Sequence, residues 1–172
     1  MADAVAIRRL DAADLRAYKA LRDRMLELYP EAFTSDASAE RGRRADDYLP
    51  RLGLDRPDGG HLVLGAWLGG ELVGAIGLER DRRDKVRHIG HVIGMMVKPE
   101  AQGRGVGRRL LAAAVGEARA AGLELLTLSV TEGNTGAVHL YERAGFERFG
   151  VLRKALRIGE RYHAKVHMVR EL

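Results

Sequence analysis

A glycine-rich segment near the middle of the chain constrains its fold most strongly. Three glycines alternate with other residues over 103–107. Residues 89–97 in front of it have the apolar pattern of a strand, and apolar residues recur behind it at steps of three and four, as on one face of a helix. Glycine lets the backbone approach a ligand closely, because no Cβ stands in the way. The pattern therefore predicts a strand–turn–helix unit whose turn faces a ligand.

The predicted turn has the chemistry of an anion site. Successive N–H groups at a helix N-terminus point outward, and the helix dipole favours a negative charge there. Arg104, Arg108 and Arg109 add positive charge beside the glycines. The alternative is a tight turn that needs glycine for steric reasons alone. The spacing Gly-x-Gly-x-Gly fits neither a Walker loop, which ends in Gly-Lys-Ser/Thr, nor the Gly-x-Gly-x-x-Gly fingerprint of dinucleotide binding.

The remaining chain alternates between strand and helix patterns. Asp11 is a candidate helix N-cap, apolar residues then recur at helical spacing up to Tyr29, and Pro30 ends that pattern. Gly69-Gly70 between two apolar runs predicts a β-hairpin. The mixture predicts an α/β fold in one domain of 172 residues. We expect strands over 6–10, 61–68, 71–78, 89–97, 125–130, 146–158 and 162–169, helices over about 15–29, 39–49, 106–121 and 135–143, and a loop through 57–60.

Composition argues against several classes of protein. The chain has no cysteine, which excludes disulfide frameworks, cysteine nucleophiles and thiolate zinc sites. Its net charge is +5, but acids are interleaved with the bases and aromatic residues make up 5%, so few surfaces could stack on bases and no nucleic-acid partner is expected. No apolar stretch is long enough to span a bilayer, and no signal peptide is visible. We therefore expect a soluble, cytoplasmic protein with no membrane partner.

A second motif follows the glycine segment after one predicted helix and one predicted strand. It contains Asn134, Ala137, Leu140-Tyr141 and Gly145-Phe146 in the pattern Asn-x-x-Ala-x-x-Leu-Tyr-x-x-x-Gly-Phe. Together with Gln-x-x-Gly-x-Gly from residue 102, it resembles the GNAT superfamily of N-acetyltransferases, over about residues 5–170. The resemblance implies one N-acetyltransferase domain over 1–172. Its α/β fold would be a mixed, mostly antiparallel sheet of six to seven strands, flanked by about four helices and splayed between the two central strands.

The resemblance also implies that acetyl-CoA is the co-substrate and that no metal takes part. The strand before the glycines would pair with the pantetheine arm, and an N–H near Met95 or Met96 would face the thioester carbonyl. The N–H groups from Gln102 to Arg108 would bind the pyrophosphate, with Asn134 on the far side of the arm. The implied cofactor-binding residues are Met95, Met96, Val97, Gln102, Gly103, Arg104, Gly105, Val106, Gly107, Arg108 and Asn134.

Catalysis would proceed by direct attack of a primary amine on the thioester in a ternary complex. Tyr141 is the candidate general acid, because a phenol with a pKa near 10 is protonated at neutral pH and can donate to the leaving sulfur; the alternative is simple packing. His91 or Glu79 is the candidate general base, and proton loss to water needs neither. A catalytically silent CoA-binding sensor and, less favoured, a basic nucleic-acid-binding module are the alternative functions.

The acceptor carries no readable signature. A small-molecule amine, a protein N-terminus and a lysine all stay open, because residues 31–60 contain no motif. His163 and His167 would lie about 13 Å apart along one strand face, too far to share a metal. The last predicted strand could pair across a homodimer through the face that holds Tyr162 and Met168, or it could complete the sheet of a monomer.

Overall fold

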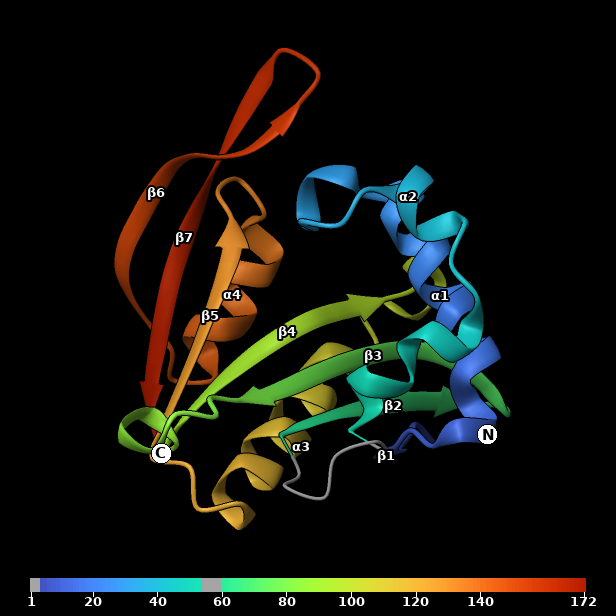
Figure 1. Ribbon diagram of the computed structural model, residues 1–172, viewed down its shortest axis with the longest axis horizontal. Helices are drawn as coiled ribbons and strands as arrows, with labels where there is room; N and C mark the ends of the chain where they lie inside the picture. Colours follow the sequence, from blue (N-terminus) through green and yellow to red (C-terminus); the bar gives the residue numbers. More distant parts are fainter. Residues whose placement is uncertain (1–3, 54–59) are drawn as a thin grey trace.

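Seven strands form one sheet in the computed structural model, which describes residues 4–53 and 60–172. Figure 1 shows the sheet, whose order is β1-β2-β3-β4-β5-β7-β6. All neighbouring strands are antiparallel except β4 and β5. The expected mixed, mostly antiparallel sheet is confirmed. The strands are β1 (Ala6–Arg9), β2 (His61–Leu68), β3 (Glu71–Arg80), β4 (Ile89–Val97), β5 (Leu125–Thr131), β6 (Glu147–Ile158) and β7 (Arg161–Glu171).

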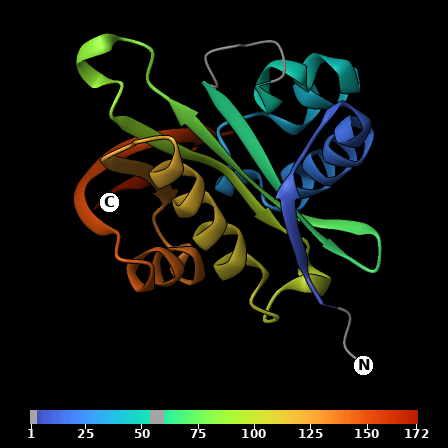
Figure 2. The same ribbon diagram turned by 90° about the horizontal axis from the view of Figure 1, so that it is seen from below.

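The described part of the chain contains four α-helices, which cover both faces of the sheet. Figures 1 and 2 show α1 and α2 on one face and α3 and α4 on the other. The helices are α1 (Leu15–Leu28), α2 (Ala37–Arg41), α3 (Val106–Ala120) and α4 (Thr135–Arg143). Short 3-10 turns lie between these elements at η1 (Ala12–Asp14), η2 (Pro30–Ala32), η3 (Ala45–Leu52), η4 (Asp84–Val86) and η5 (Pro99–Ala101).

The apolar faces of the helices pack on the sheet from both sides. Leu110 and Ala114, one helical turn apart on α3, are fully buried against the central strands. On the opposite face, Leu21 and Met25 of α1 pack with Tyr48 of η3. Because β3 is covered on both faces, seven of its ten residues are buried. The sheet is therefore a rigid central layer.

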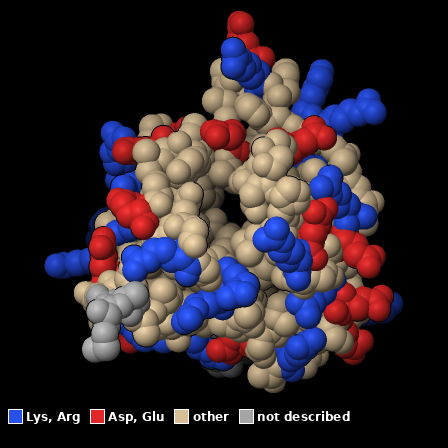
Figure 3. Space-filling model, turned by 180° about the vertical axis from the view of Figure 1, so that it is seen from behind, with Lys and Arg blue, Asp and Glu red and all other residues tan. Residues whose placement is uncertain are grey.

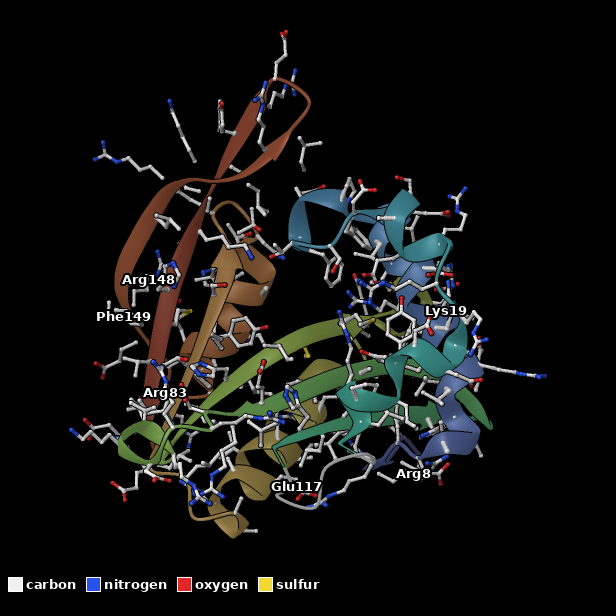
Figure 4. All side chains as sticks on the ribbon, in the orientation of Figure 1. Arg8, Lys19, Arg83, Glu117, Arg148 and Phe149 are labelled. Carbon is white, nitrogen blue, oxygen red and sulfur yellow. The ribbon has the colours of Figure 1, made fainter. Side chains whose placement is uncertain are left out.

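Asp11 caps η1, the 3-10 turn that leads into α1, whereas the N-cap position of α1 itself is Asp14. The carboxylate of Asp11 accepts a hydrogen bond from the N–H of Ala13 at 2.8 Å, and Asp14 accepts one from the N–H of Asp11 at 2.9 Å. Arg8 of β1 pairs with Asp14 at 2.6 Å, which ties the cap to the sheet. Figure 4 shows Arg8 at the lower edge of the molecule, on the same side as Glu117 of α3. The reciprocal cap satisfies donors that the helix itself cannot use.

The sheet opens between its two central strands. β4 and β5 pair over three rungs only, from Ile89 with Leu125 to His91 with Thr127. β5 instead pairs with β7 along its whole length, from Leu125 to Thr131. Beyond His91 the two central strands therefore diverge, and the expected splay is confirmed (Figure 1).

A bulge lies in β4 where the strands diverge. Gly77 of β3 is opposite Ile93 and Ala75 is opposite Met96, so Gly94 and Met95 share the space opposite a single residue. Gly94 has a φ of 58°, in the left-handed region that favours glycine. The bulge interrupts the ladder and turns backbone groups of β4 away from β3.

The predicted helix over 39–49 is wrong in extent. The structure has two separate turns there, α2 and η3, with Gly42 between them. Asp36 starts α2 two residues earlier, because its carboxylate accepts a hydrogen bond from the N–H of Ala39 at 3.0 Å. The loop predicted through 57–60 falls, except for Gly60, outside the described residues.

The last strand lies inside the sheet. β7 pairs with β5 on one side and with β6 on the other, so both of its edges are used within the chain. Met168 is fully buried in the core beside α4. Of the two alternatives for this strand, completion of the monomer's sheet is the one observed. β6 forms the outer edge, and Figure 4 shows Arg148 and Phe149 there, far from the opening between β4 and β5.

Candidate active site

A cavity of about 750 Å³ occupies the opening between β4 and β5. Its walls come from β4, the glycine turn, the start of α4 and the segment after α1. Figure 3 shows a hollow near the centre of the rear face, walled mostly by uncharged residues, with Lys and Arg gathered below it. All of the expected cofactor-binding residues line this cavity except Arg104, which is exposed on the turn: Met95, Met96, Val97, Gln102, Gly103, Gly105, Val106, Gly107, Arg108 and Asn134.

The glycine turn presents a row of free donors. The N–H of Gln102 donates to the carbonyl of Pro99 at 3.2 Å, and the N–H of Arg109 donates to the carbonyl of Gly105 at 3.0 Å. Between them, the N–H groups of residues 103–108 have no acceptor in the described part of the chain. The row of free N–H groups that was expected from Gln102 to Arg108 is therefore one residue shorter, because the N–H of Gln102 is used in the last hydrogen bond of η5. Free donors at a helix N-terminus suit a phosphate group.

Glycine is required in this turn for two different reasons. Gly103 and Gly105 have φ values of 72° and 76°, which residues with a Cβ rarely adopt. Gly107 has an ordinary backbone, but a Cβ there would lie 3.2 Å from Cε of Met95 and 3.3 Å from a methyl group of Leu140. The first two glycines shape the turn, and the third lets α3 approach β4 and α4.

Polar groups near the turn are arranged to hold it in place. The side-chain amide of Gln102 donates to the carbonyl of Val97 at 3.2 Å, which links the turn to the end of β4. Across the cavity, the side-chain oxygen of Asn134 accepts a hydrogen bond from the N–H of Ala137 at 3.3 Å and caps α4. Asn134 also lines the cavity.

Tyr141 lies at the inner end of the opening. A smaller cavity of about 220 Å³ adjoins the larger one, and Tyr141 lines it together with Gly94 and Met95 of the bulge. The ring packs edge-on against Phe146, with 6.0 Å between ring centroids. Burial raises the pKa of Tyr141 to about 12. Its hydroxyl makes no hydrogen bond to any residue that the structure describes, so the group is protonated at neutral pH and available to a ligand.

The two candidate bases lie away from both cavities. His91 and Glu79 are opposite each other on β4 and β3. His91 Nδ1 is 2.7 Å from the hydroxyl of Thr127, at the last paired rung below the opening, and Glu79 is 3.4 Å from the ring of His61. Neither residue lines the larger or the smaller cavity. The structure brings these two side chains together but does not bring them to Tyr141.

Several cavity residues had no signal in the sequence. Phe33 comes from the segment after α1, and Thr131, His163 and Lys165 come from β5 and β7. The alternation of side chains along β7 is the one pattern that could have located His163 and Lys165. Val166 faces the core, so its neighbours in the strand must face the other way.

The described residues contain no group of three or more His, Asp or Glu side chains that could hold a metal ion. No helix in the same part of the chain is both long enough and apolar enough to cross a membrane.

The family model "Acetyltransferase (GNAT) family" matches residues 21–146, which include the α1 face, the glycine turn and Tyr141. The chain belongs to the GNAT acetyltransferase family. The resemblance noted in the two sequence motifs is confirmed, and the GNAT match covers the second half of α1, the strands β2 to β5, and the helices α3 and α4.

Curated relatives of this GNAT chain carry different names. A mycothiol acetyltransferase of Salinispora tropica is 35% identical over 144 residues, which cover 81% of this chain and 46% of that protein. The N-alpha-acetyltransferase RimI of Mycobacterium tuberculosis is 40% identical over 96 residues, which cover 55% of this chain and 58% of that protein. The chain therefore spans about half the length of the mycothiol acetyltransferase that it matches.

A solved structure has the same fold over nearly the whole chain. YncA from Salmonella typhimurium, solved with its cofactor acetyl-CoA, superposes with a TM-score of 0.85 at 23% identity and covers 98% of this chain and 94% of its own. The two proteins therefore share one fold.

Proposed function

We propose that this chain moves an acetyl group from acetyl-CoA to a primary amine by direct attack in a ternary complex. One observation carries the proposal. The free N–H groups of residues 103–108 open onto a cavity between two splayed strands, and a protonated tyrosine, Tyr141, lines the smaller cavity that adjoins it. Family membership supports an acetyltransferase, and the solved relative with acetyl-CoA supports the donor.

The backbone would hold the donor. The N–H groups of residues 103–108 would bind the pyrophosphate, with Arg108 adding charge at the cavity wall. The backbone of β4 from Met95 to Val97, which β5 leaves unpaired, would pair with the amides of the pantetheine arm like an added strand. The bulge at Gly94 would place the thioester beside Tyr141.

The amine nitrogen would attack the thioester carbonyl carbon and form a tetrahedral oxyanion. An N–H of β4 near Met95 or Met96 is proposed to stabilise that oxyanion. As the carbon–sulfur bond breaks, the hydroxyl of Tyr141 would give its proton to the sulfur. The nitrogen loses one proton, and Tyr141 regains one from solvent, so no net charge is left at the site.

Proton loss from the amine is proposed to go to water. His91 and Glu79 do not line either cavity, so neither is placed to take the proton directly. Holding the amine against the thioester is itself worth several kcal/mol, and a dedicated base is not needed for a nucleophile bound in its neutral form. The two candidate bases remain predictions that mutation can test.

The acceptor differs among the curated relatives, whose names point to a mycothiol step in one case and to an N-alpha-amine in the other. The proposal is therefore limited to a primary amine of a small molecule or a protein.

The test is a measurement of free thiol released from acetyl-CoA in the presence of a broad amine panel, alongside thermal shifts with acetyl-CoA, CoA and an oligonucleotide. We expect stabilisation by acetyl-CoA and amine-dependent thiol release. Stabilisation by both CoA forms without thiol release from any amine would point instead to a silent CoA-binding sensor. Stabilisation by the oligonucleotide alone would point to a nucleic-acid-binding module.

A further inference from the structure

The smaller cavity contains one formal charge. It adjoins the larger cavity, with which it shares Phe33, Met95 and Asn134, and its inner wall holds Tyr141. Of the described residues that line it, Lys165 alone is ionised at neutral pH, since the other side chains are apolar, hydroxyl or amide groups. The place where acetyl transfer is proposed to occur is therefore positive and otherwise neutral.

Lys165 has no acidic partner in the described part of the chain. Its ammonium donates a hydrogen bond to the hydroxyl of Thr34 at 2.9 Å, and no carboxylate lies within ion-pairing distance. The acids that line the adjoining larger cavity, Glu31 and Glu132, are exposed and do not line the smaller one. Burial lowers the pKa of Lys165, as expected for a half-buried cation that lacks a counter-ion. A negative charge from a ligand would complete the site.

The position of Lys165 is set by the sheet. Its backbone lies opposite Thr131 of β5 and Leu152 of β6, so it is held by both neighbours of β7. The next residue, Val166, is buried in the core, which turns Lys165 toward the opposite face and the cavity. The hydrogen bond to Thr34 then fixes the far end of the side chain beside Phe33. A cation built into a strand in this way is a preorganised binding group.

We propose that Lys165 binds a carboxylate carried by the acceptor, so that the amine substrate is a small amino acid and not a polyamine. The inference rests on the proposed acetyl transfer and names the acceptor class of that same site. The ammonium has a second effect that works in the same direction. A fixed positive charge beside the acceptor disfavours the protonated form of the incoming amine and favours the neutral form that attacks.

The test uses the full chain and matched acceptor pairs. Each amino acid is compared with its primary amide, which keeps the α-amine and the side chain but lacks the charge, and spermidine serves as a polyamine. Rates are expressed per neutral amine, because the two members of a pair differ in amine pKa. We expect kcat/KM for the acids to exceed that for the amides by at least about tenfold, as for one hydrogen bond to a charged group.

Variants separate charge recognition from folding. Lys165→Met should bring the acid-to-amide ratio close to one while turnover of the amides continues, and Lys165→Arg should retain most of the preference. Lys85→Met, which changes an exposed lysine of η4, is the matched control and should leave the ratio unchanged. The acetyl-CoA thermal shift of each variant shows that the fold and the donor site are intact.

Equal rates for acids and amides, a preference for spermidine, or a preference unaffected by Lys165→Met would each overturn the assignment. So would intact mass spectra that show rapid acetylation of Lys165 by acetyl-CoA, because that lysine would then be the acceptor itself. Failure to turn over any amine, charged or neutral, would overturn the proposed function, whereas turnover of neutral amines alone would overturn only the role of Lys165.

Discussion

The hydroxyl of Thr131 donates a hydrogen bond to the carbonyl oxygen of Glu31 at 2.6 Å and so joins the end of β5 to the segment after α1. Thr131 is 3% exposed, and both residues line the larger cavity. Beside it, Lys165 and Thr34 make a second link between β7 and the same segment. The segment after α1, which lies on the proposed acceptor side, is therefore attached to β5 and β7, on the far side of the opening between β4 and β5.

Removing the hydrogen bond between Thr131 and Glu31 should loosen the segment after α1. In Thr131→Val the carbonyl of Glu31 loses its partner at nearly constant side-chain volume, and we expect a loss of about 1 kcal/mol in the free energy of unfolding. Hydrogen exchange over residues 31–34 should become faster, and KM for the amine should rise more than KM for acetyl-CoA. Thr135→Val, at an exposed threonine, is the control. Unchanged exchange in this segment would contradict the role of the link.

Two glycines of the same region should respond in opposite ways to alanine. Gly105→Ala forces a Cβ into a φ of 76°, so we expect a cost of about 1–2 kcal/mol and a clear loss of acetyl-CoA affinity. Gly116→Ala lies in the middle of α3, where a Cβ would meet open space, and should stabilise the chain by up to about 1 kcal/mol. Unfolding midpoints and acetyl-CoA titrations measure both effects. Equal responses would mean that the turn does not need its left-handed backbone.

Tyr141→Phe should lower kcat about 10²-fold or more with acetyl-CoA binding intact, because it removes the proposed proton donor but keeps the packing against Phe146. The raised pKa, about 12, keeps the phenol protonated well past pH 10, so kcat should show no alkaline loss from this group below that pH. Because the folded-state pKa is above the unfolded value, its contribution to stability is complete below pH 10 and declines as the pH rises toward 12. Tyr162→Phe, at an exposed ring, is the control; equal kcat values for the two variants would remove Tyr141 from the mechanism.

The pH dependence of kcat/KM for the acceptor amine tests the absence of a dedicated base. If water takes the proton, log kcat/KM should rise linearly with pH until the acceptor amine is neutral. The slope should survive His91→Ala and Glu79→Ala, whose side chains are outside both cavities. A drop of more than about tenfold in either variant, together with a new inflection in the profile, would assign that residue as the base.

The buried ion pair between Arg22 and Glu40 should dominate the stability of the chain at acid pH. Glu40 accepts hydrogen bonds from Arg22 at 3.0 Å and from Tyr48 at 2.5 Å, and Arg22 also donates to Ser35 at 2.7 Å. Burial raises the pKa of Glu40, but the hydrogen bonds from Tyr48 and Arg22 outweigh it and lower the pKa overall. Its stabilisation is therefore present above the unfolded pKa, near 4.3, and is lost as the pH falls through the lowered folded value.

Glu40→Gln should destabilise the chain by about 3 kcal/mol at neutral pH, because it leaves Arg22 buried without a counter-ion, and should flatten the stability profile below pH 5. Glu27→Gln breaks an exposed pair with Arg41 and should cost less than about 1 kcal/mol. Denaturant unfolding across pH 3–8 distinguishes the two. A cost for Glu40→Gln no larger than that for Glu27→Gln would show that the buried pair adds little.

Local patterns in the sequence were enough for most of the fold. The strand over 89–97 has the same bounds in the structure, because Pro99 and the glycines that follow it stop the ladder abruptly. The helix predicted over 39–49 failed, because its polar sequence forms two turns whose shape depends on burying Glu40 and Tyr48 under α1. Where the structure of a segment depends on such distant contacts, short-range periodicity carries no information.

The same limit applies to the site. The proposed donor side lies on one strand, one turn and one helix N-terminus, so two motifs were enough to predict nearly all of the residues that line this part of the cavity. The acceptor side depends on pairs such as Thr131 with Glu31 and Lys165 with Thr34, which are 100 and 131 positions apart in the chain. Nothing near either member of a pair indicates the other. Glu79 and His91 are opposite each other on neighbouring strands, and the sequence could not show that the sheet is closed at their level.

β4 and β5 form the single parallel pair in an otherwise antiparallel sheet. Beyond its three rungs, the backbone donors and acceptors of β4 that face β5 have no partner among the described strands. An acetyl donor that paired with these groups, as proposed, would be recognised by main-chain groups, which every residue type supplies. The proposed acceptor, in contrast, would meet side chains of the segment after α1, β5 and β7. Mutations can therefore accumulate on the acceptor side at little cost to donor binding, and a chain with this architecture can change its substrate while it retains its source of acetyl groups.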